Sequence, residues 1–149
     1  MPVPLAPKVV PANGGADIVA FGIPMNIRLR AEETGGAFAA LVASFERGMG
    51  PPPHFHHDHE EYFFVLAGSF ELTVGGETFV ADEGAIAFVP RETVHSFRCL
   101  SEKGRILEWG TPGGQEKYFE AVDAMARTDA LTPEKVVALS KEFETEFVG

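Results

Sequence analysis

The stretch that decides the fold of this chain runs over residues 48–61 and reads GMGPPPHFHHDHEE. A β-strand turns alternate side chains to the same face, so His54 and His56 would point one way and the residue between them the other. Imidazole nitrogen and carboxylate oxygen are ligands that borderline divalent metals accept, and a site that also takes a substrate keeps coordination positions open. The stretch therefore predicts half of a metal site, which Glu61 and the distant His95 would complete.

The same short-strand pattern continues on both sides of this stretch. Residues 70–74 alternate apolar and polar side chains, Gly75-Gly76 supplies a turn, and residues 78–80 return, which predicts a β-hairpin. Residues 37–45 and 61–66 are apolar on both faces, as in strands that lie between two layers. We therefore expect an all-β protein, built as a barrel or sandwich.

The two ends of the chain depart from the strand pattern. Residues 1–16 are rich in proline and glycine and predict an extended arm before a barrel over residues 17–111. In residues 112–149 the apolar period changes to about three and a half, which predicts a C-terminal helical extension. Thr132 and Pro133 are typical of the N-cap and first position of its second helix.

Each of the two predicted helices carries an apolar stripe. The stripe of the first helix consists of Tyr118, Val122 and Met125, and that of the second of Val136, Leu139, Phe143 and Phe147. The ordinary interpretation is that both helices pack on the outside of the barrel. The alternative is that they cover the barrel mouth or contact a dimer partner.

Composition excludes several function classes. A chain of 149 residues, 45% hydrophobic, fits one globular domain with a sizeable core. The net charge of −10 offers no basic surface for phosphates, so we expect neither nucleic acid nor an anionic membrane as a partner. The single cysteine cannot form an internal disulfide, and residues 1–7 lack the features of a signal peptide, so a cytoplasmic location is expected. No apolar run approaches the length of a membrane span.

The spacing of the histidines and glycines resembles the two sequence motifs of the cupins. The first motif is matched by Gly48, His54, His56, Glu61 and Gly68, and the second by Gly84, Pro90 and His95. The two motifs together, over roughly residues 36–110, are far more specific than either alone. The resemblance implies a cupin barrel, which is a jelly-roll-like double-stranded β-helix. It also implies that the three motif histidines and Glu61 bind one divalent metal.

Two positions depart from the cupin pattern. The glycine expected two residues after Pro90 is Glu92, and the asparagine that closes the second motif is Cys99. Neither position is a metal ligand in the family. The departures therefore affect the local turn and the lining of the pocket, and leave the expected metal ligands in place.

A narrower resemblance points to one group of cupins. Four segments look like the single-domain relatives of quercetinases: residues 34–38, the triple proline 51–53, residues 60–68 and residues 111–119. In those enzymes the glutamate deprotonates a flavonol before dioxygen cleaves its ring with loss of carbon monoxide. The resemblance therefore implies a metal-dependent dioxygenase with Glu61 as base. The metal could be manganese, iron, cobalt, nickel or zinc, because these ligands do not select one.

Two further histidines leave a second ligand set open. His57 and His59 would ordinarily belong to a solvated loop, because loops run over the surface. The alternative is that His59 enters the metal sphere and displaces Glu61, which gives a four-histidine site. Similar small cupins act as cyclases in aromatic polyketide biosynthesis, where a histidine moves protons, and the extra histidines keep that function open. A non-catalytic cupin that binds a small molecule is a further alternative.

Strand parity predicts what surrounds the metal. Glu61 shares its face with Phe63, and His95 shares its face with Phe97 and Cys99, so these side chains are expected to line a common cavity. Cys99 would be a small wall residue there, since a lone buried thiol is usually inert. A cavity walled by phenylalanine would select a small, flat, apolar aromatic molecule as substrate.

The outer strands and the apolar stripe of the C-terminal helix also predict association. Residues 25–30 are expected to form a short strand after the arm, and single-domain cupins commonly pair through such outer strands. Pairing would cover open sheet edges, so we expect a homodimer.

Overall fold

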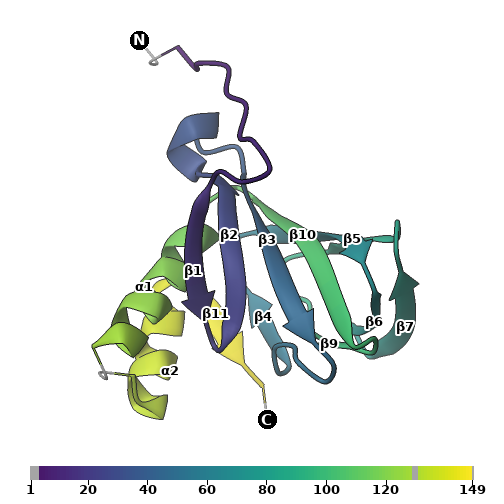
Figure 1. The fold of residues 1–149 in the computed structure, drawn as a ribbon. Coiled ribbons are helices and arrows are strands. Elements are labelled where there is room, and N and C mark those ends of the chain that lie inside the picture. Colours follow the sequence, from purple (N-terminus) through teal and green to yellow (C-terminus); the bar gives the residue numbers. More distant parts are fainter. Residues whose placement is uncertain (1–3, 129–130, 149) are drawn as a thin grey trace.

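Two antiparallel β-sheets face each other and enclose a common interior (Figure 1). The computed structural model describes residues 4–128 and 131–148. Its elements are, in order, β1 (Ala16–Ala20), β2 (Ile23–Leu29), a 3-10 helix (Ala31–Thr34), β3 (Ala39–Glu46), β4 (His54–His56), β5 (Glu60–Ala67), β6 (Ser69–Val74), β7 (Glu77–Asp82), β8 (Ile86–Val89), β9 (His95–Cys99), β10 (Lys103–Thr111), α1 (Gln115–Arg127), α2 (Pro133–Glu142) and β11 (Thr145–Phe147).

In both sheets, strands that are far apart in the sequence lie next to each other. One sheet has the order β1-β2-β3-β10-β5-β8, and the other has the order β11-β4-β9-β6-β7. Apart from the hairpin partners β6 and β7, successive strands from β3 to β10 alternate between the sheets, with β4 in one and β5 in the other. The expected all-β barrel with a C-terminal helical extension is confirmed.

The predicted hairpin is confirmed between β6 and β7, which pair from Ser69↔Asp82 to Val74↔Glu77. It begins at Gly68, whose φ of 82° lies in the left-handed region. A Cβ atom at this position would lie 2.5 Å from the carbonyl oxygen of Lys103, so only glycine fits here without a backbone shift. The motif glycine is thus explained by backbone packing between β6 and β10.

Alternation along the strands separates an aromatic interior from an outer face. Inside, Phe45 contacts Phe70 and Phe97 edge-on, with ring centroids 5.4 Å apart in both pairs. Outside, Trp109 stacks on its cross-strand neighbour Tyr62, with centroids 5.2 Å apart and an interplanar angle of 6°. The inner aromatic side chains fill one part of the barrel and leave a cavity beside them.

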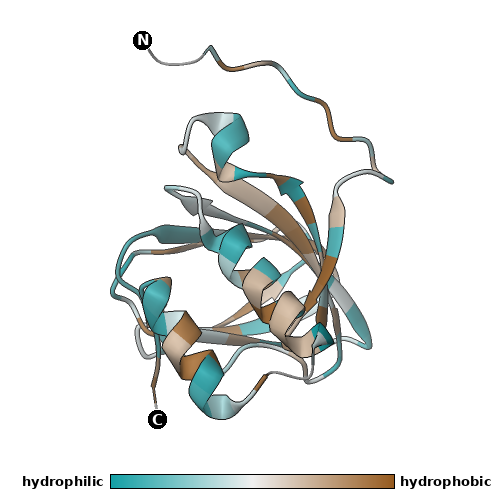
Figure 2. Cartoon of the chain, turned by 90° about the vertical axis from the view of Figure 1, so that its left-hand side faces the viewer, coloured by the Kyte–Doolittle hydropathy of each residue, from teal (hydrophilic) through white to brown (hydrophobic). Residues whose placement is uncertain are grey.

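The two helices cover the open side of the barrel, which corrects the expectation that they pack on its outside (Figure 2). Tyr118 and Phe119 of α1 and Val136 and Val137 of α2 line the interior cavity. The apolar stripes bury their surface there against the apolar lining of the cavity. None of the helices in residues 4–128 and 131–148 combines the length and apolar character needed to cross a membrane.

The end of the helical extension differs from the sequence prediction. The expected stripe continued through Phe147, but α2 ends at Glu142 and Phe147 belongs to strand β11. The chain reverses at Glu144, which has a φ of 54°, and β11 then pairs with β4 in the register Thr145↔His56 and Phe147↔His54. The edge of β4 has unpaired backbone groups, and residues 145–147 form hydrogen bonds with them as a strand. These bonds would be lost if α2 continued for another turn, so strand pairing prevails over the helical pattern.

Candidate metal centre

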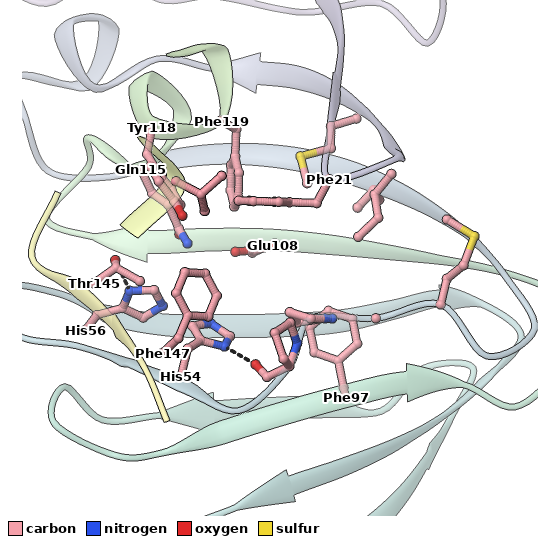
Figure 3. A pocket seen from close by; sticks show the side chains of 18 of the residues that line it. Phe21, His54, His56, Phe97, Glu108, Gln115, Tyr118, Phe119, Thr145 and Phe147 are labelled. Carbon is pink, nitrogen blue, oxygen red and sulfur yellow. Dashed lines mark hydrogen bonds between the residues drawn. The ribbon is translucent and has the colours of Figure 1, made fainter. Parts of the chain in front are cut away.

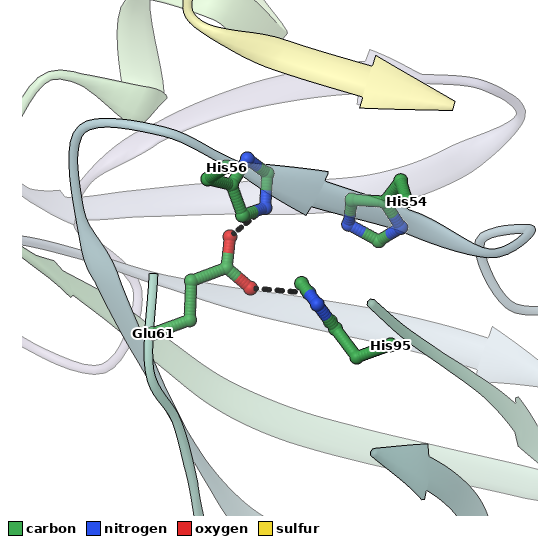
Figure 4. Close-up of side chains that lie close together, drawn as sticks. All are labelled: His54, His56, Glu61 and His95. Carbon is green, nitrogen blue, oxygen red and sulfur yellow. Dashed lines mark hydrogen bonds and ion pairs between the residues drawn. The ribbon is translucent and has the colours of Figure 1, made fainter. Parts of the chain in front are cut away.

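Four side chains from both sheets converge on one point of the interior (Figure 4). His54 and His56 come from β4, His95 from β9 and Glu61 from β5 of the facing sheet. One ligand atom from each of the four lies within 4.8 Å of the others, and all four residues are between 1% and 8% exposed. The cluster forms because β4 and β9 are neighbours, in which His54 lies directly opposite His95. The structure thus brings together the four residues that the cupin resemblance implies as ligands.

Hydrogen bonds at Nδ1 set the tautomer of all three histidines. His54 Nδ1 lies 2.8 Å from the carbonyl oxygen of Pro52, and His95 Nδ1 lies 2.9 Å from that of Thr93. A carbonyl oxygen only accepts, so each Nδ1 carries the proton and donates it. His56 Nδ1 lies 2.7 Å from Thr145 Oγ1. The Nε2 lone pairs of these imidazoles are therefore free to act as ligands.

The Thr145 hydroxyl is itself fixed as an acceptor toward His56. Its Oγ1 donates to the carbonyl oxygen of Phe143 over 3.2 Å, so its single proton is already used. His56 must then supply the proton of the Nδ1 to Oγ1 hydrogen bond. The strand β11 thereby determines which ring nitrogen of His56 faces the cluster.

A buried nitrogen without a hydrogen bond shows that the donor set fits a cation. His56 Nε2 is buried and, among the described residues, has no hydrogen-bond partner, although Glu61 Oε1 lies only 2.7 Å away. Two electron-pair donors at this distance repel each other unless a positive charge lies between or beside them. A divalent metal supplies that charge and accepts both lone pairs, so three imidazoles and a carboxylate fit such an ion.

The protonation states of the cluster agree with this assignment. Burial lowers the pKa of His54 to about 4, so its ring is neutral near pH 7, as a metal ligand must be. Burial raises the pKa of the Glu61 carboxyl, but the adjacent imidazoles of His56, His59 and His95 outweigh it and hold that pKa well below its usual range. Glu61 is therefore ionised.

His59 is buried, which corrects the expectation of a solvated loop for this residue. It is 6% exposed, and its ring packs against that of His56 with centroids 4.3 Å apart. Its Nδ1 lies 2.7 Å from Asp58 Oδ1, and its Nε2 lies 3.3 Å from Glu61 Oε1. Burial lowers the pKa of His59, but these two carboxylates raise it overall above its ordinary value. With both ring nitrogens facing carboxylates, His59 contacts Glu61 and lies beside the four-residue cluster.

His57 lies on the partly exposed surface, as expected for a loop residue. Its ring contacts the carboxylates of Glu92 and Glu146, and these hydrogen bonds raise the pKa of His57 to about 9. This ion pair connects the loop after β4 with β11. It does not reach the cluster.

Gln115 and Thr145 contact the cluster, and the sequence pattern did not predict either as a site residue. The amide of Gln115 donates from Nε2 to Glu61 Oε1 over 2.6 Å, and Thr145 fixes His56 as described above. Both residues follow the barrel in sequence and reach the site through tertiary packing. Gln115 had one available signal, since it directly follows Pro112-Gly113-Gly114 at the start of a helix.

A cavity of about 740 Å³ opens beside the cluster (Figure 3). His54, His56 and Glu61 form part of its wall, and most of the remaining lining is apolar or aromatic. Phe63 and Phe97 line it, as strand parity predicts. The cavity thus places an apolar binding space directly against the candidate metal ligands.

Cys99 lies outside the cavity lining, which corrects its predicted place in the pocket. It shares the inward face with Phe97 but is only 1% exposed and belongs to the packed core. A Cβ atom on Gly104 would lie 2.9 Å from Cys99 Sγ, so the thiol packs against the backbone of β10. The strand β9 leads away from the metal cluster, and by Cys99 the cavity has closed.

Glu108 is a further cavity residue that the sequence prediction missed. It lies on β10, is 7% exposed and lines the cavity together with Glu61. Burial, and the nearby charge of Glu61, raise the pKa of the Glu108 carboxyl well above its usual range. An available signal was its position on the inward face of β10, between Ile106 and Gly110.

Comparison with known proteins agrees with the geometry. Residues 41–109 match the family model of the cupin domain. The chain is 32% identical over 89 residues to a quercetin 2,3-dioxygenase from Bacillus subtilis, which covers 60% of this chain and 26% of that protein. A quercetin 2,3-dioxygenase from Aspergillus japonicus is also 32% identical, over 90 residues that cover 57% of this chain and 26% of that protein. The chain spans between a quarter and a half of the length of the first curated relatives it matches.

Solved structures share the fold at lower identity. An RmlC-like cupin from Shewanella frigidimarina superposes with a TM-score of 0.62 at 19% identity, over 74% of this chain and 96% of that one. The polyketide cyclase RemF from Streptomyces resistomycificus superposes with a TM-score of 0.60 at 22% identity, over 71% of this chain and 80% of that one. Residues 41–109 therefore form a cupin domain, and the two-sheet fold around it is shared with a solved cupin.

Proposed function

We propose that this chain is a metal-dependent enzyme that acts on an apolar, polyphenolic aromatic molecule, with quercetinase-like oxygenation as its reaction. One observation carries the proposal. Three Nε2 lone pairs and the Glu61 carboxylate converge on the wall of an apolar cavity of about 740 Å³. Cavities of about 300–1,000 Å³ with a few convergent polar groups are typical of small-molecule sites. The two relatives named quercetin 2,3-dioxygenase support the same choice of reaction.

Glu61 has the properties of a base for such a substrate. It is ionised, buried and part of the cavity wall, so it can take the proton of a ligand hydroxyl that enters the site. A bound divalent metal would stabilise the resulting oxyanion. Gln115 donates to Glu61 Oε1 and holds the carboxylate toward the cluster.

The apolar walls bind and shield the rest of the molecule. Phe63 and Phe97 come from the two facing sheets, and Phe119 of α1 lies across the mouth. A flat aromatic ring system gains dispersion contacts and loses water on entering such a space. Excluding water also protects an electron-rich substrate anion from reprotonation.

A cyclase acting on an aromatic polyketide is the second candidate, and His59 is the observation that favours it. Its buried ring connects Asp58, near the surface, with Glu61 inside, through one hydrogen bond at each nitrogen. Such a ring can pass a proton between the two carboxylates, and a cyclisation needs protons moved without an oxidant. RemF shares the fold, and its 22% identity adds no argument about the reaction.

Oxygen uptake separates these functions. Purified protein would be loaded in turn with manganese, iron, cobalt, nickel or zinc and mixed with a panel of flavonols and polyketide-like phenols. We expect oxygen consumption with at least one metal and one flavonol, and its loss in His95→Ala. Product formation without oxygen consumption would support the cyclase. Binding without any turnover would contradict both and leave a non-catalytic cupin.

A further inference from the structure

Glu108 is a buried carboxyl group in the middle of the cavity (Figure 3). Its cross-strand neighbours are Leu41 on β3 and Phe63 on β5, and each of these residues is 3% exposed. These side chains offer no hydrogen bond, and no partner of the Glu108 carboxyl is found among the described residues. Glu108 itself is 7% exposed, so more than nine tenths of it is shielded from solvent.

The other polar side chains of the cavity wall have partners within the protein. His54 bonds to Pro52, His56 to Thr145, Glu61 to Gln115, Tyr118 to Ser140 and Thr132 to the backbone of Lys135. Glu108 stands apart from them in this respect. A buried polar group without a partner is costly, and a group of this kind that faces a cavity can be satisfied by a molecule that binds there.

We propose that Glu108 anchors the ligand at a second point of the cavity wall, on β10, by donating a hydrogen bond from its carboxyl group to a ligand oxygen. The substrate class then narrows to aromatic molecules with two separated oxygen functions. One is an acidic hydroxyl that meets Glu61, and the other is an acceptor, such as a carbonyl or a further hydroxyl, that meets Glu108. Burial and the charge of Glu61 raise the pKa of the Glu108 carboxyl well above its usual range, which favours the protonated form that this role requires.

This inference rests on the proposed function in one respect, which is that an aromatic ligand fills the cavity. Calorimetric titration of zinc-loaded protein tests it without requiring turnover. The probes are quercetin, which carries hydroxyls at both ends of its ring system, and 3-hydroxyflavone, which has oxygens only around its central ring. Glu108→Leu should weaken quercetin binding about tenfold and 3-hydroxyflavone binding less than about twofold. Glu108→Gln, which keeps a donor and an acceptor, should stay within about threefold of wild type for both.

Thermal unfolding without flavonol tests Glu108 independently of the probes. If the carboxyl is kept for a ligand, Glu108→Leu should have an unchanged or higher Tm, because it removes a buried group without a partner. A structural role would require a lower Tm. The matched control is Glu102→Leu in the exposed turn between β9 and β10, which should change neither Tm nor binding.

The outcomes separate the inference from the proposed function. Unchanged quercetin affinity in Glu108→Leu, equal weakening of both probes, or a Tm several degrees below wild type would overturn the role of Glu108. Failure of the wild-type protein to bind either flavonol would overturn the polyphenol substrate. In that case the unfolding comparison still decides whether Glu108 is structural.

Discussion

His56 donates from Nδ1 to the hydroxyl of Thr145 over 2.7 Å, and the two residues are cross-strand partners in β4 and β11. The orientation of one candidate metal ligand therefore depends on a strand that lies 89 residues further along the chain. Residues that hold the second ring nitrogen of a ligating histidine commonly tune metal affinity. This makes Thr145 a direct test of the metal centre.

Thr145→Val should weaken zinc binding by about 10- to 100-fold, because valine keeps the shape of the side chain and removes the acceptor for His56. Thr145→Ser keeps a hydroxyl and should remain within a few-fold of wild type. Competition with a chromophoric chelator measures both affinities. Equal zinc affinity in the valine and wild-type proteins would mean that Thr145 does not orient a ligand.

Purified protein is expected to hold about one divalent metal per chain, since four ligand atoms converge on one point. His54→Ala and His95→Ala should each lose most of it. His57→Ala is the matched control, because this histidine is partly exposed and does not reach the cluster. Elemental analysis reads out the result, and wild-type protein without metal, even after reloading with each ion, would refute the site.

The rival ligand sets give opposite mutant patterns. If Glu61 is ligand and base, Glu61→Gln should abolish turnover and keep part of the metal through three imidazoles. His59→Ala should then keep the metal, because both His59 nitrogens face carboxylates. Metal loss in His59→Ala together with an active Glu61→Gln protein would instead establish the four-histidine site.

Glu92, at the position where the cupin pattern has glycine, has a backbone conformation that favours glycine. Its φ is 67°, in the left-handed region that costs a residue with a Cβ about 1–2 kcal/mol. Compared with Glu92→Ala, which also loses the carboxylate that faces His57, Glu92→Gly should raise the free energy of unfolding by roughly 0.5–1 kcal/mol after the entropy of the unfolded chain is counted. Urea denaturation measures this change. Glu92→Ala keeps the Cβ, and a glycine variant less stable than the alanine variant would contradict the expectation.

The homodimer remains a prediction, and the structure offers two outer edges for it. Four large apolar side chains on β7 and β8, the outer strands of the two sheets, are 51–66% exposed: Phe79, Val80, Ile86 and Phe88. We expect a second copy of the chain to cover these two edge strands, since exposed apolar edge strands otherwise aggregate. Light scattering should then give twice the 16.1 kDa of one chain.

Matched substitutions identify the edge. Phe79→Lys combined with Ile86→Lys should give a monomer, whereas Val19→Lys on β1, the opposite outer strand, should leave the dimer intact. The reverse result would assign pairing to β1. A mass near 16.1 kDa that does not change on concentrating the sample would refute the dimer.

The sequence predicted the barrel and the convergence of His54, His56, Glu61 and His95 because both depend on local alternation and on motif spacing. It did not predict the burial of His59, since a histidine in a short loop between strands of facing sheets can turn either way. The hydrogen bonds of Gln115 and Thr145 depend on how the helical extension crosses the mouth. Local periodicity carries no information about that crossing.

Phe147 shows the same limit at the level of secondary structure. Its spacing from Leu139 and Phe143 fits a helical stripe, and the unpaired edge of β4 is what draws residues 145–147 into a strand. Tertiary hydrogen bonding thus decided an element that propensity left open.

The position of Trp109, stacked on Tyr62, determines what tryptophan fluorescence can measure in this protein. Trp109 is the single tryptophan, and it lies on the outer face of β10, next to Glu108, whose side chain points inward. Its emission will follow unfolding of the sheet. A flavonol in the cavity would be separated from the indole by the sheet itself and would dim it through resonance energy transfer. Quenching of Trp109 fluorescence therefore reports a flavonol that lies on the other side of the sheet. Partial quenching is enough to show that the cavity is occupied.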